Sequence, residues 1–286
     1  MRNSLLNIQV KKVTDDHSFI TEDKLAVEEP LEIQLQYRDV GNVLTKSVSV
    51  TMRTPGNDKE LATGFLFTEG IISQASLVVN TVSKGDTNII TVVLGDDVQP
   101  ALHKTERNFY TTSSCGVCGK ASIDAIKTVS PFPASEDHLC VDVSLFYGLQ
   151  QTLKSHQHIF ENTGGLHASA LFDLQANLLY VREDVGRHNA LDKLIGHAFL
   201  HNHLPLNNHI LLLSGRASFE LIQKAIMAGI KMIAAIGAPS SLAVQMAEEA
   251  GITLIGFLKH DRFNIYTGWQ RINTAAKMGQ TIKTVM

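Results

Sequence analysis

The sequence predicts an α/β protein (α+β overall), in which a smaller β-rich N-terminal domain precedes a C-terminal α/β domain. Three observations predict this class. The 286 residues are 44% hydrophobic and 19% charged, a composition typical of a globular chain. The first third carries strand patterns, whereas strands and helices alternate in the last third. The composition also shifts between about residues 110 and 140, so we place the domains at 1–138 and 139–286.

In the N-terminal part, residues 31–37 (LEIQLQY) and 47–52 (SVSVTM) alternate apolar with polar side chains, as half-buried strands do. The second run stops at a turn signal, RTPG. Asp58 then follows as the expected N-cap of a helix over 59–68. The β-branched run 88–94 (NIITVVL) predicts another strand.

In the C-terminal part, three apolar runs predict buried strands: 208–213, 232–236 and 252–258. A helical pattern follows the first run and continues through Gly229. A second helical pattern follows the next run and ends at Gly251, a suitable residue just past a helix end. Strands separated by helices at this spacing favour parallel crossovers.

Charge and hydropathy exclude two classes of partner. Lys and Arg total 25 against 28 Asp and Glu, and the net charge of −3 gives no electrostatic footprint for nucleic acid. No stretch approaches the roughly 18 apolar residues of a membrane span, and the first residues lack a signal-peptide pattern. With three cysteines, a secreted disulfide framework is not expected. We therefore expect a cytoplasmic protein.

The segment 111–120 (TTSSCGVCGK) places Cys115 and Cys118 at C-x-x-C spacing among small residues. A helical pattern follows at 120–127, so the helix dipole and Lys120 would favour a nucleophilic thiolate. Three other interpretations compete: a zinc site completed by Cys140 and a histidine, a thioredoxin-like dithiol, or two small buried residues. Spacing alone leaves a metal site and a reactive thiol about equally open.

Glycine turns with cationic side chains form a second feature. Gly215 and Arg216 follow an apolar strand and open a helix, an arrangement that can cradle an anion. The segment 182–189 (REDVGRHN), which includes Arg187, and the segment 162–167 (NTGGLH) add further turns. Together they favour a phosphate-bearing ligand at the carboxyl ends of the strands.

The histidines do not make a metal site in this reading. His197, His201 and His203 cluster, but no carboxylate ligand at suitable spacing joins them. We therefore expect a solvated helix end there.

Five blocks together resemble the FdhD family of sulfurtransferases, which active formate dehydrogenase requires. The resemblance extends over essentially the whole chain, with the blocks in the family's order. These blocks are RTPGNDKELATGFLFTEGII (53–72), SSCGVCGK (113–120), TGGLHASALF (163–172), REDVGRHNALDK (182–193) and SGRASFELIQKA (214–225).

The resemblance implies a sulfur carrier. Such a protein accepts sulfur from a cysteine desulfurase as a persulfide, here on Cys115 with Cys118 assisting. It passes the sulfur to the bis(molybdopterin guanine dinucleotide) molybdenum cofactor, whose nucleotide ends GDP mimics, and the cofactor then enters formate dehydrogenase. No zinc is expected, and a homodimer is left open.

The resemblance also implies a cofactor-binding stretch and a fold. The stretch would fall on Phe257, Leu258, Lys259, His260, Asp261 and Arg262. The larger domain would resemble cytidine deaminases, yet the chain has no H-x-E or C-x-E, so deamination is set aside. The alternative function is a non-catalytic zinc- or nucleotide-binding assembly factor.

Overall fold

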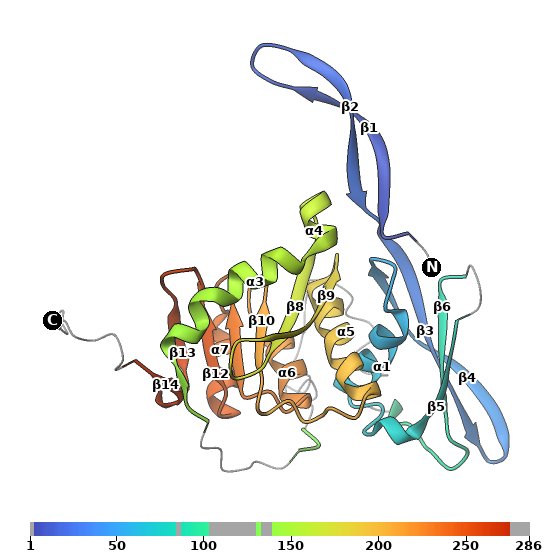
Figure 1. The fold of residues 1–286 in the computed structure, drawn as a ribbon. Helices are drawn as coiled ribbons and strands as arrows, with labels where there is room; N and C mark the ends of the chain where they lie inside the picture. Colours follow the sequence, from blue (N-terminus) through green and yellow to red (C-terminus); the bar gives the residue numbers. More distant parts are fainter. Residues whose placement is uncertain (1–2, 84–86, 103–129, 133–138, 275–286) are drawn as a thin grey trace.

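A computed structural model describes residues 3–83, 87–102, 130–132 and 139–274 (Figure 1). Most of these residues belong to two sheets. A four-stranded sheet lies in the N-terminal part and a six-stranded sheet in the C-terminal part. The architecture is therefore mixed α/β with a β-rich N-terminal part, as predicted. The predicted domain boundary at residue 138 lies outside the described residues and stays a prediction.

The N-terminal sheet has the order β4-β3-β6-β5, with β3 and β6 parallel and the other pairs antiparallel. Alternation along β3 buries Leu31, Ile33 and Leu35 on one face, which confirms the predicted half-buried strand. The other two predicted strands are confirmed as well. The strands are β3 (Glu29–Asp39), β4 (Asn42–Arg53), β5 (Val78–Ser83) and β6 (Ile89–Leu94), and a short 3₁₀ turn, η1 (Ala75–Leu77), precedes β5.

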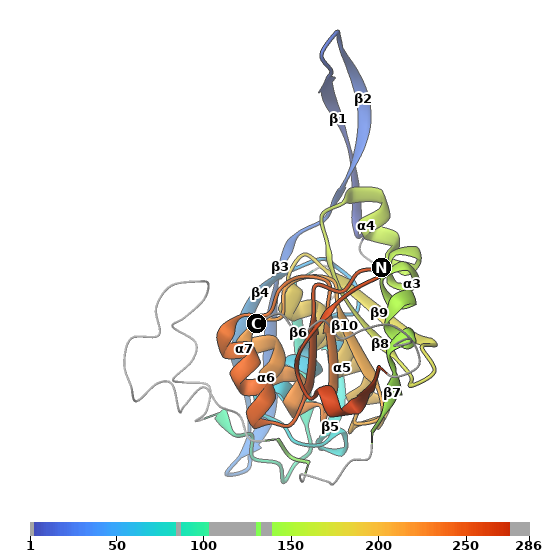
Figure 2. The ribbon, with the colours of Figure 1, turned by 90° about the vertical axis from the view of Figure 1, so that its left-hand side faces the viewer.

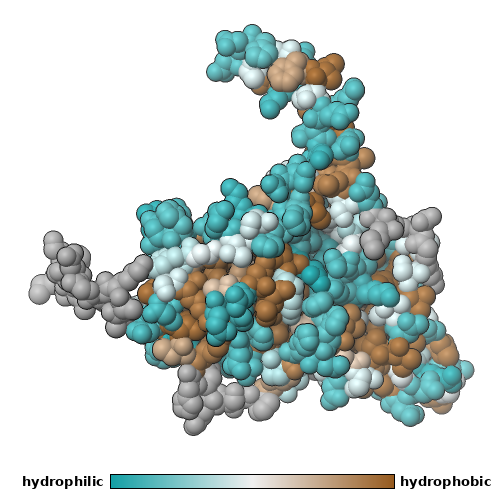
Figure 3. Space-filling view, viewed as in Figure 1, coloured by the Kyte–Doolittle hydropathy of each residue, from teal (hydrophilic) through white to brown (hydrophobic). Residues whose placement is uncertain are grey.

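An antiparallel hairpin, which the sequence analysis did not predict, projects from the body of the molecule (Figure 1). It consists of β1 (Leu5–Val13) and β2 (Ser18–Ala26). Apolar side chains on it are exposed, among them Leu6, Phe19 and Ile20, and brown residues accordingly follow the hairpin in Figure 3. Its base is tied to the body where Lys24 donates a hydrogen bond to Asn162, at 3.1 Å.

Helix α1 (Asp58–Thr68) lies between β4 and β5 in the chain. The prediction that Asp58 caps this helix is wrong. The N-cap is Asn57, in the left-handed conformation and without a side-chain cap. The Asp58 carboxylate instead accepts two hydrogen bonds from Arg53, both 2.9 Å long, because the buried guanidinium requires an anionic partner.

The C-terminal sheet has the order β13-β12-β11-β10-β8-β9. Strands β10, β11 and β12 are parallel, which confirms the predicted crossovers, and the flanking pairs are antiparallel. The strands are β8 (His167–Phe172), β9 (Leu178–Asp184), β10 (Ile210–Leu213), β11 (Met232–Ala235), β12 (Thr253–Gly256) and β13 (Asn264–Thr267).

Helices cover both faces of this sheet, with α6 and α7 on one side and α3 on the other (Figure 2). Gly251 follows α7 with φ +62°, as expected for a helix-ending glycine. The helices are α3 (Leu149–His156), α4 (His158–Thr163), α5 (Arg187–Leu200), α6 (Phe219–Met227) and α7 (Ser241–Glu249). The small elements are β7 (Val141–Asp142), β14 (Ile272–Asn273), η4 (Val143–Gly148) and η5 (Trp269–Arg271).

Two hydrophobic clusters pack against opposite faces of the C-terminal sheet. The larger one includes side chains from β3, α1, α5, α6 and α7, so it is continuous from the N-terminal sheet to the C-terminal sheet. The smaller one lies under α3 and η4. Among the described residues, no helix is long and apolar enough to cross a membrane.

Candidate functional site

The turns that follow β10, β11 and β12 meet at one edge of the C-terminal sheet, because parallel strands end on the same side. We call this edge, at the carboxyl ends of the parallel strands, the carboxyl edge. The amide of Gly237, after β11, donates to the carbonyl of Gly215, after β10, at 2.9 Å. The amide of Phe257, after β12, donates to the carbonyl of Gly237 at 3.1 Å. Two stretches of the chain predicted to bind the cofactor, Gly215–Arg216 and 257–262, are thus brought side by side.

Two glycines in these hydrogen-bonded turns cannot carry a side chain without displacing a neighbouring atom. A Cβ on Gly237 would lie 3.0 Å from both the Arg216 Cγ and the Gly215 carbonyl oxygen. A Cβ on Gly215 would lie 3.2 Å from Nδ1 of His167. The close packing of backbone at this edge therefore depends on glycine.

The segment 257–262 forms a tight turn, in which the Lys259 amide donates to the Arg262 carbonyl at 2.9 Å. Phe257 adopts a left-handed φ of 53° and its side chain is 45% exposed, a strained conformation of the kind found at ligand sites. Leu258 differs from its neighbours, because it is buried in the core under α3. Its contribution is to anchor the turn. His260 and Asp261 are exposed, with 3.6 Å between Nδ1 and Oδ1.

Cations gather at this edge. Arg187 is the first residue of α5, and its charge acts on His167, at the start of β8. Burial of His167, reinforced by the charge of Arg187, lowers the pKa of this histidine and favours the neutral ring. Within the part of the chain that the structure describes, none of these cations forms an ion pair with a carboxylate: Arg187, Arg216, Lys259 and Arg262. Cationic groups without carboxylate partners suit an anionic ligand.

One carboxylate, Glu220 in the first turn of α6, lies among these cations. Its Oε2 is 3.8 Å from Nε2 of His188. The interaction with His188 lowers the pKa of Glu220 to about 2, although partial burial opposes the shift. Glu220 is therefore ionised at neutral pH, and a ligand at this edge meets a negative charge as well as positive ones.

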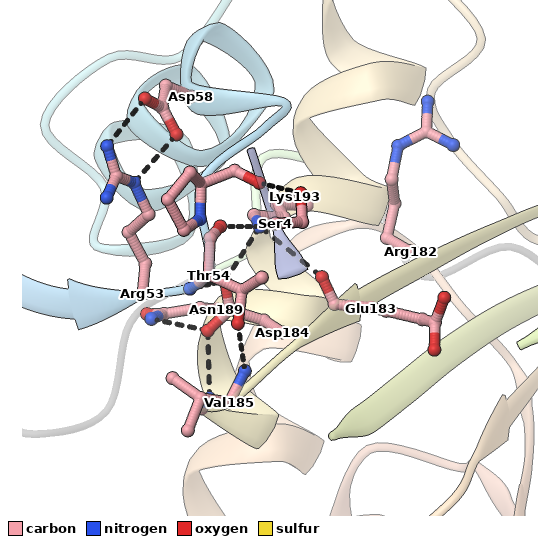
Figure 4. A network of polar contacts seen from close by, with 12 residues as sticks. Ser4, Arg53, Thr54, Asp58, Arg182, Glu183, Asp184, Val185, Asn189 and Lys193 are labelled. Carbon is pink, nitrogen blue, oxygen red and sulfur yellow. Dashed lines mark hydrogen bonds and ion pairs between the residues drawn. The ribbon is translucent and has the colours of Figure 1, made fainter. Parts of the chain in front are cut away.

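A buried polar network attaches the N-terminal sheet to this edge (Figure 4). Lys193 of α5 pairs with Asp184 at 2.7 Å and donates to the carbonyl of Thr54 at 2.9 Å. The same Asp184 accepts from the Thr54 amide at 3.2 Å and from Asn189 at 3.0 Å. Sequence reasoning did not identify Asp184 or Lys193. The available signal was a lysine within the apolar pattern of α5, which indicates a buried charge with a partner.

A second polar cluster corrects the expectation for His197. It does not belong to a solvated helix end: its Nδ1 lies 2.9 Å from Glu60 of α1, and Arg182 also binds Glu60. Burial alone would raise the pKa of Glu60, but the contacts with Arg182 and His197 lower it. Arg182 is therefore committed to a structural ion pair, unlike Arg187 in the same predicted segment.

A cavity of about 440 Å³ opens beside the glycine turns, between helices α3 and α4 and the start of β8. It reaches Ser214 and Ile236, which directly follow β10 and β11. Its volume is within the range of small-molecule sites. The sequence motif NTGGLH lies on its wall through Gly164, Gly165 and His167.

The predicted sulfur-bearing residues, Cys115 and Cys118, lie outside the described residues. Of the described residues that flank this segment in the chain, Leu102 and Phe132 pack against the larger hydrophobic cluster. Phe132 lies close to Gly229, at the end of α6, since a Cβ there would be 3.2 Å from its ring. Gly229 precedes β11, so Phe132 lies toward the amino ends of the parallel strands. Cys140, the third cysteine, is exposed and free.

The family model of the FdhD/NarQ family matches residues 26–273, a range that contains both sheets and the carboxyl edge. The chain belongs to the FdhD/NarQ family. The resemblance of the five sequence blocks is thereby confirmed. The four blocks that the structure describes each supply a residue to the contacts at and beside the carboxyl edge. These residues are Thr54, His167, Asp184, Lys193 and Gly215.

Several relatives of this family member are similar over nearly their full length. A protein of Mycolicibacterium paratuberculosis named sulfur carrier protein FdhD is 49% identical over 274 residues, which cover 92% of this chain and 97% of the relative. One of the same name from Sulfurisphaera tokodaii is 42% identical over 265 residues, which cover 93% of this chain and 98% of the relative.

A solved structure has the same fold. It is the crystal structure of a putative formate dehydrogenase accessory protein from Desulfotalea psychrophila, with a TM-score of 0.71. The match covers 95% of this chain and all of the other, at 21% identity. At that identity the likeness establishes the fold.

Proposed function

We propose that this protein is a sulfurtransferase that supplies sulfur to a molybdenum cofactor needed by formate dehydrogenase. A cysteine desulfurase donates the sulfur, Cys115 holds it as a persulfide, and Cys118 assists its transfer. The substrate that receives the sulfur is the bis(molybdopterin guanine dinucleotide) cofactor. The names of the relatives, sulfur carrier proteins at 42–49% identity, support the carrier role.

The observation that carries the proposal is the meeting of the glycine turns and unpaired cations at one sheet edge. The cofactor is a large anion with phosphates along its length. The turns at Gly215 and Gly237 directly follow the carboxyl ends of the parallel strands β10 and β11, the edge at which such sheets bind ligands, and Arg216 and Arg187 supply positive charge. Lys259 and Arg262 extend the same edge toward β13. The residues present therefore fit a nucleotide-bearing anion.

The loading step needs no external oxidant. The thiolate of Cys115 attacks the terminal sulfur of the desulfurase's cysteine persulfide. A new S–S bond forms on Cys115 while the bond to the donor cysteine breaks, and the donor leaves as a thiolate. Lys120, two residues after Cys118 in the sequence, favours the attacking thiolate.

Mass spectrometry tests the proposal. The protein is incubated with a cysteine desulfurase and cysteine, and its peptides are then analysed without reductant. A gain of one sulfur atom on the Cys115 peptide is expected, and none on the Cys140 peptide. Stoichiometric zinc with no sulfur gain would instead support the zinc-binding assembly factor and contradict the sulfurtransferase.

A further inference from the structure

The turn between β3 and β4 holds a valine in a conformation that valine rarely adopts. Asp39 pairs with Asn42 at the end of the hairpin, so the turn consists of Val40 and Gly41. Both have a positive φ, of 46° and 83°, as in the type I′ turns that tight hairpins favour. Asparagine is the usual residue before such a glycine, whereas a β-branched side chain in the left-handed region is strained. Local backbone preference therefore does not explain the valine.

Packing within the chain does not explain it either, because the Val40 side chain is 94% exposed. Two further apolar side chains that are exposed, Val43 and Leu44, follow on β4. Val79 at the start of β5 is exposed as well, and it lies near Gly95, since a Cβ on that glycine would be 3.9 Å from its Cγ2. We call Val40, Val43, Leu44 and Val79 the apolar tip. Brown residues cover this end of the N-terminal sheet, at the lower right of Figure 3.

The apolar tip is bonded to the stretch of chain that leads toward the thiols. Arg38 pairs with Asp96 at 2.7 Å, and the Gln99 side chain donates to the Arg38 carbonyl at 2.9 Å. Asp96 and Gln99 follow β6, and the described chain continues from there to Leu102. The apolar tip therefore lies beside the stretch from which the chain enters the segment that carries Cys115.

This end of the molecule is separate from the carboxyl edge. Figure 1 shows the β3–β4 turn at the bottom, at the end of the N-terminal sheet opposite the β1–β2 hairpin. The base of that hairpin is bonded to α4, which borders the cavity beside the carboxyl edge. Phe132, which the chain reaches after the thiol segment, lies toward the amino ends of the parallel strands. A partner bound at the apolar tip therefore leaves the carboxyl edge free.

Exposed carboxylates surround the apolar tip. Asp39 directly precedes Val40, and Asp96 and Asp97 line a shallow recess together with Val40 and Arg38. The Arg38 guanidinium offsets one of these negative charges. A complementary surface on a partner is therefore apolar at its centre and basic at its rim.

We propose that the apolar tip is the docking surface for the sulfur donor, a cysteine desulfurase that presents an apolar hollow bordered by basic side chains. The inference rests on the proposed function, since it assigns where the donor binds before Cys115 attacks its persulfide. Docking beside the thiol segment raises the effective concentration of that persulfide at Cys115. It also accounts for the strained valine, because the Val40 methyl groups are then buried in the complex.

A substitution of Val40 separates docking from folding, because the two should change in opposite directions. Asparagine fits the left-handed turn, so Val40→Asn should raise the midpoint of thermal unfolding by about 2–4 °C. Its affinity for the purified desulfurase, measured by titration calorimetry, should fall roughly tenfold, since an apolar contact is lost. Desulfurase binding as tight as that of the unaltered protein would overturn the docking surface.

Two valines of β4 form a matched pair. Val43 and Val50 have similar exposed fractions, 54% and 58%, but only Val43 lies close to the turn. Val43→Asn should weaken desulfurase binding roughly tenfold, because it removes an apolar contact of the tip. Val50→Asn should bind the desulfurase as the unaltered protein does. Equal weakening in the two variants would contradict a localised surface.

The rate of sulfur loading distinguishes this inference from the proposed function. With limiting desulfurase and excess cysteine, the Cys115 peptide of Val40→Asn should gain sulfur roughly tenfold more slowly than that of the unaltered protein. Cysteine persulfide, a small donor that needs no docking surface, should load both proteins at the same rate. Slower loading by both donors would overturn the docking surface, because the substitution would then act on the thiol segment itself.

The remaining outcomes are equally decisive. If both donors load Val40→Asn as fast as the unaltered protein, the docking surface is overturned and the proposed function stands. If neither donor loads the unaltered protein, the proposed function is overturned, and this inference with it. Sedimentation of the unaltered protein and Val40→Asn completes the test: a change of oligomeric state would assign the apolar tip to a second copy of the chain and overturn the desulfurase as its occupant.

Discussion

Gly64 of α1 and Gly196 of α5 lie against each other's helix backbone, so the two helices cross without intervening side chains. A Cβ on Gly64 would overlap the carbonyl of Asp192, and a Cβ on Gly196 would overlap that of Glu60. The N-terminal sheet is therefore joined to the C-terminal sheet by a helix pair in direct contact. This contact also sets where Thr54, which precedes α1 in the chain, meets Asp184 and Lys193.

The first prediction concerns this crossing. Gly196→Ala should lower the free energy of unfolding by about 3 kcal/mol or more, because a methyl group forces the helices apart. Chemical denaturation measures the change. Gly148→Ala is the control, since a Cβ there meets nothing within 4 Å and its φ is −93°. A loss of the same size in both variants would mean that the close crossing is not the cause.

The buried ion pair gives the second prediction. Lys193→Met leaves the buried Asp184 carboxylate without its cation and should cost about 3–5 kcal/mol of stability. Adding Asp184→Asn should recover part of the loss, because the uncompensated charge is then gone. Asp96→Asn removes the exposed partner of Arg38, a pair 2.7 Å apart, and should change stability little. Thermal unfolding of the four proteins tests this order.

The third prediction is a pH dependence at Glu220. Its pKa is lowered to about 2 in the folded protein from an ordinary 4.5, so its contribution to stability is fully present above about pH 4.5. That contribution is lost as the pH falls toward 2. His188→Ala removes the main cause and should move the Glu220 pKa up toward 4.5. A carboxyl NMR titration reads the value directly; an unchanged pKa in the variant would contradict the pairing.

The fourth prediction concerns the cations of the carboxyl edge. Arg216→Ala should weaken GDP binding by roughly tenfold, and the difference should shrink as salt screens the charge. Arg38→Ala, which removes an exposed arginine on β3, should leave binding unchanged. Calorimetry at two salt concentrations measures both variants. If Arg38→Ala weakened GDP binding as much as Arg216→Ala, net charge and not a site would explain the effect.

The fifth prediction assigns the sulfur-bearing thiol. Cys115→Ala should abolish sulfur loading and activation of formate dehydrogenase in cells that lack the native protein. Cys140→Ala should leave both intact, since Cys140 is a separate, exposed thiol. Full formate dehydrogenase activity with Cys115→Ala would show that the sulfur is carried elsewhere.

The sequence by itself was sufficient for several of the elements and for the family, although it did not reveal the β1–β2 hairpin. The runs at 31–37, 208–213 and 252–258 predicted strands that the structure contains, because alternation and apolar runs are local properties of the chain. The turn at Gly215–Arg216 was also predictable, since a glycine after a buried strand is a local signal. The five sequence blocks indicated the family without any distance information.

The tertiary structure decided which of these residues meet, because pairing between distant segments leaves no local pattern. Asp58 could have been a helix cap, but its carboxylate accepts two hydrogen bonds from the buried Arg53 instead. His197 could have been solvated, but Glu60 of α1 packs against it. Arg182 and Arg187 look alike in sequence, yet only Arg182 has a carboxylate partner among the described residues. The cavity beside the glycine turns leaves no signal in any single stretch of sequence, because α3, α4 and β8 enclose it only in the complete fold.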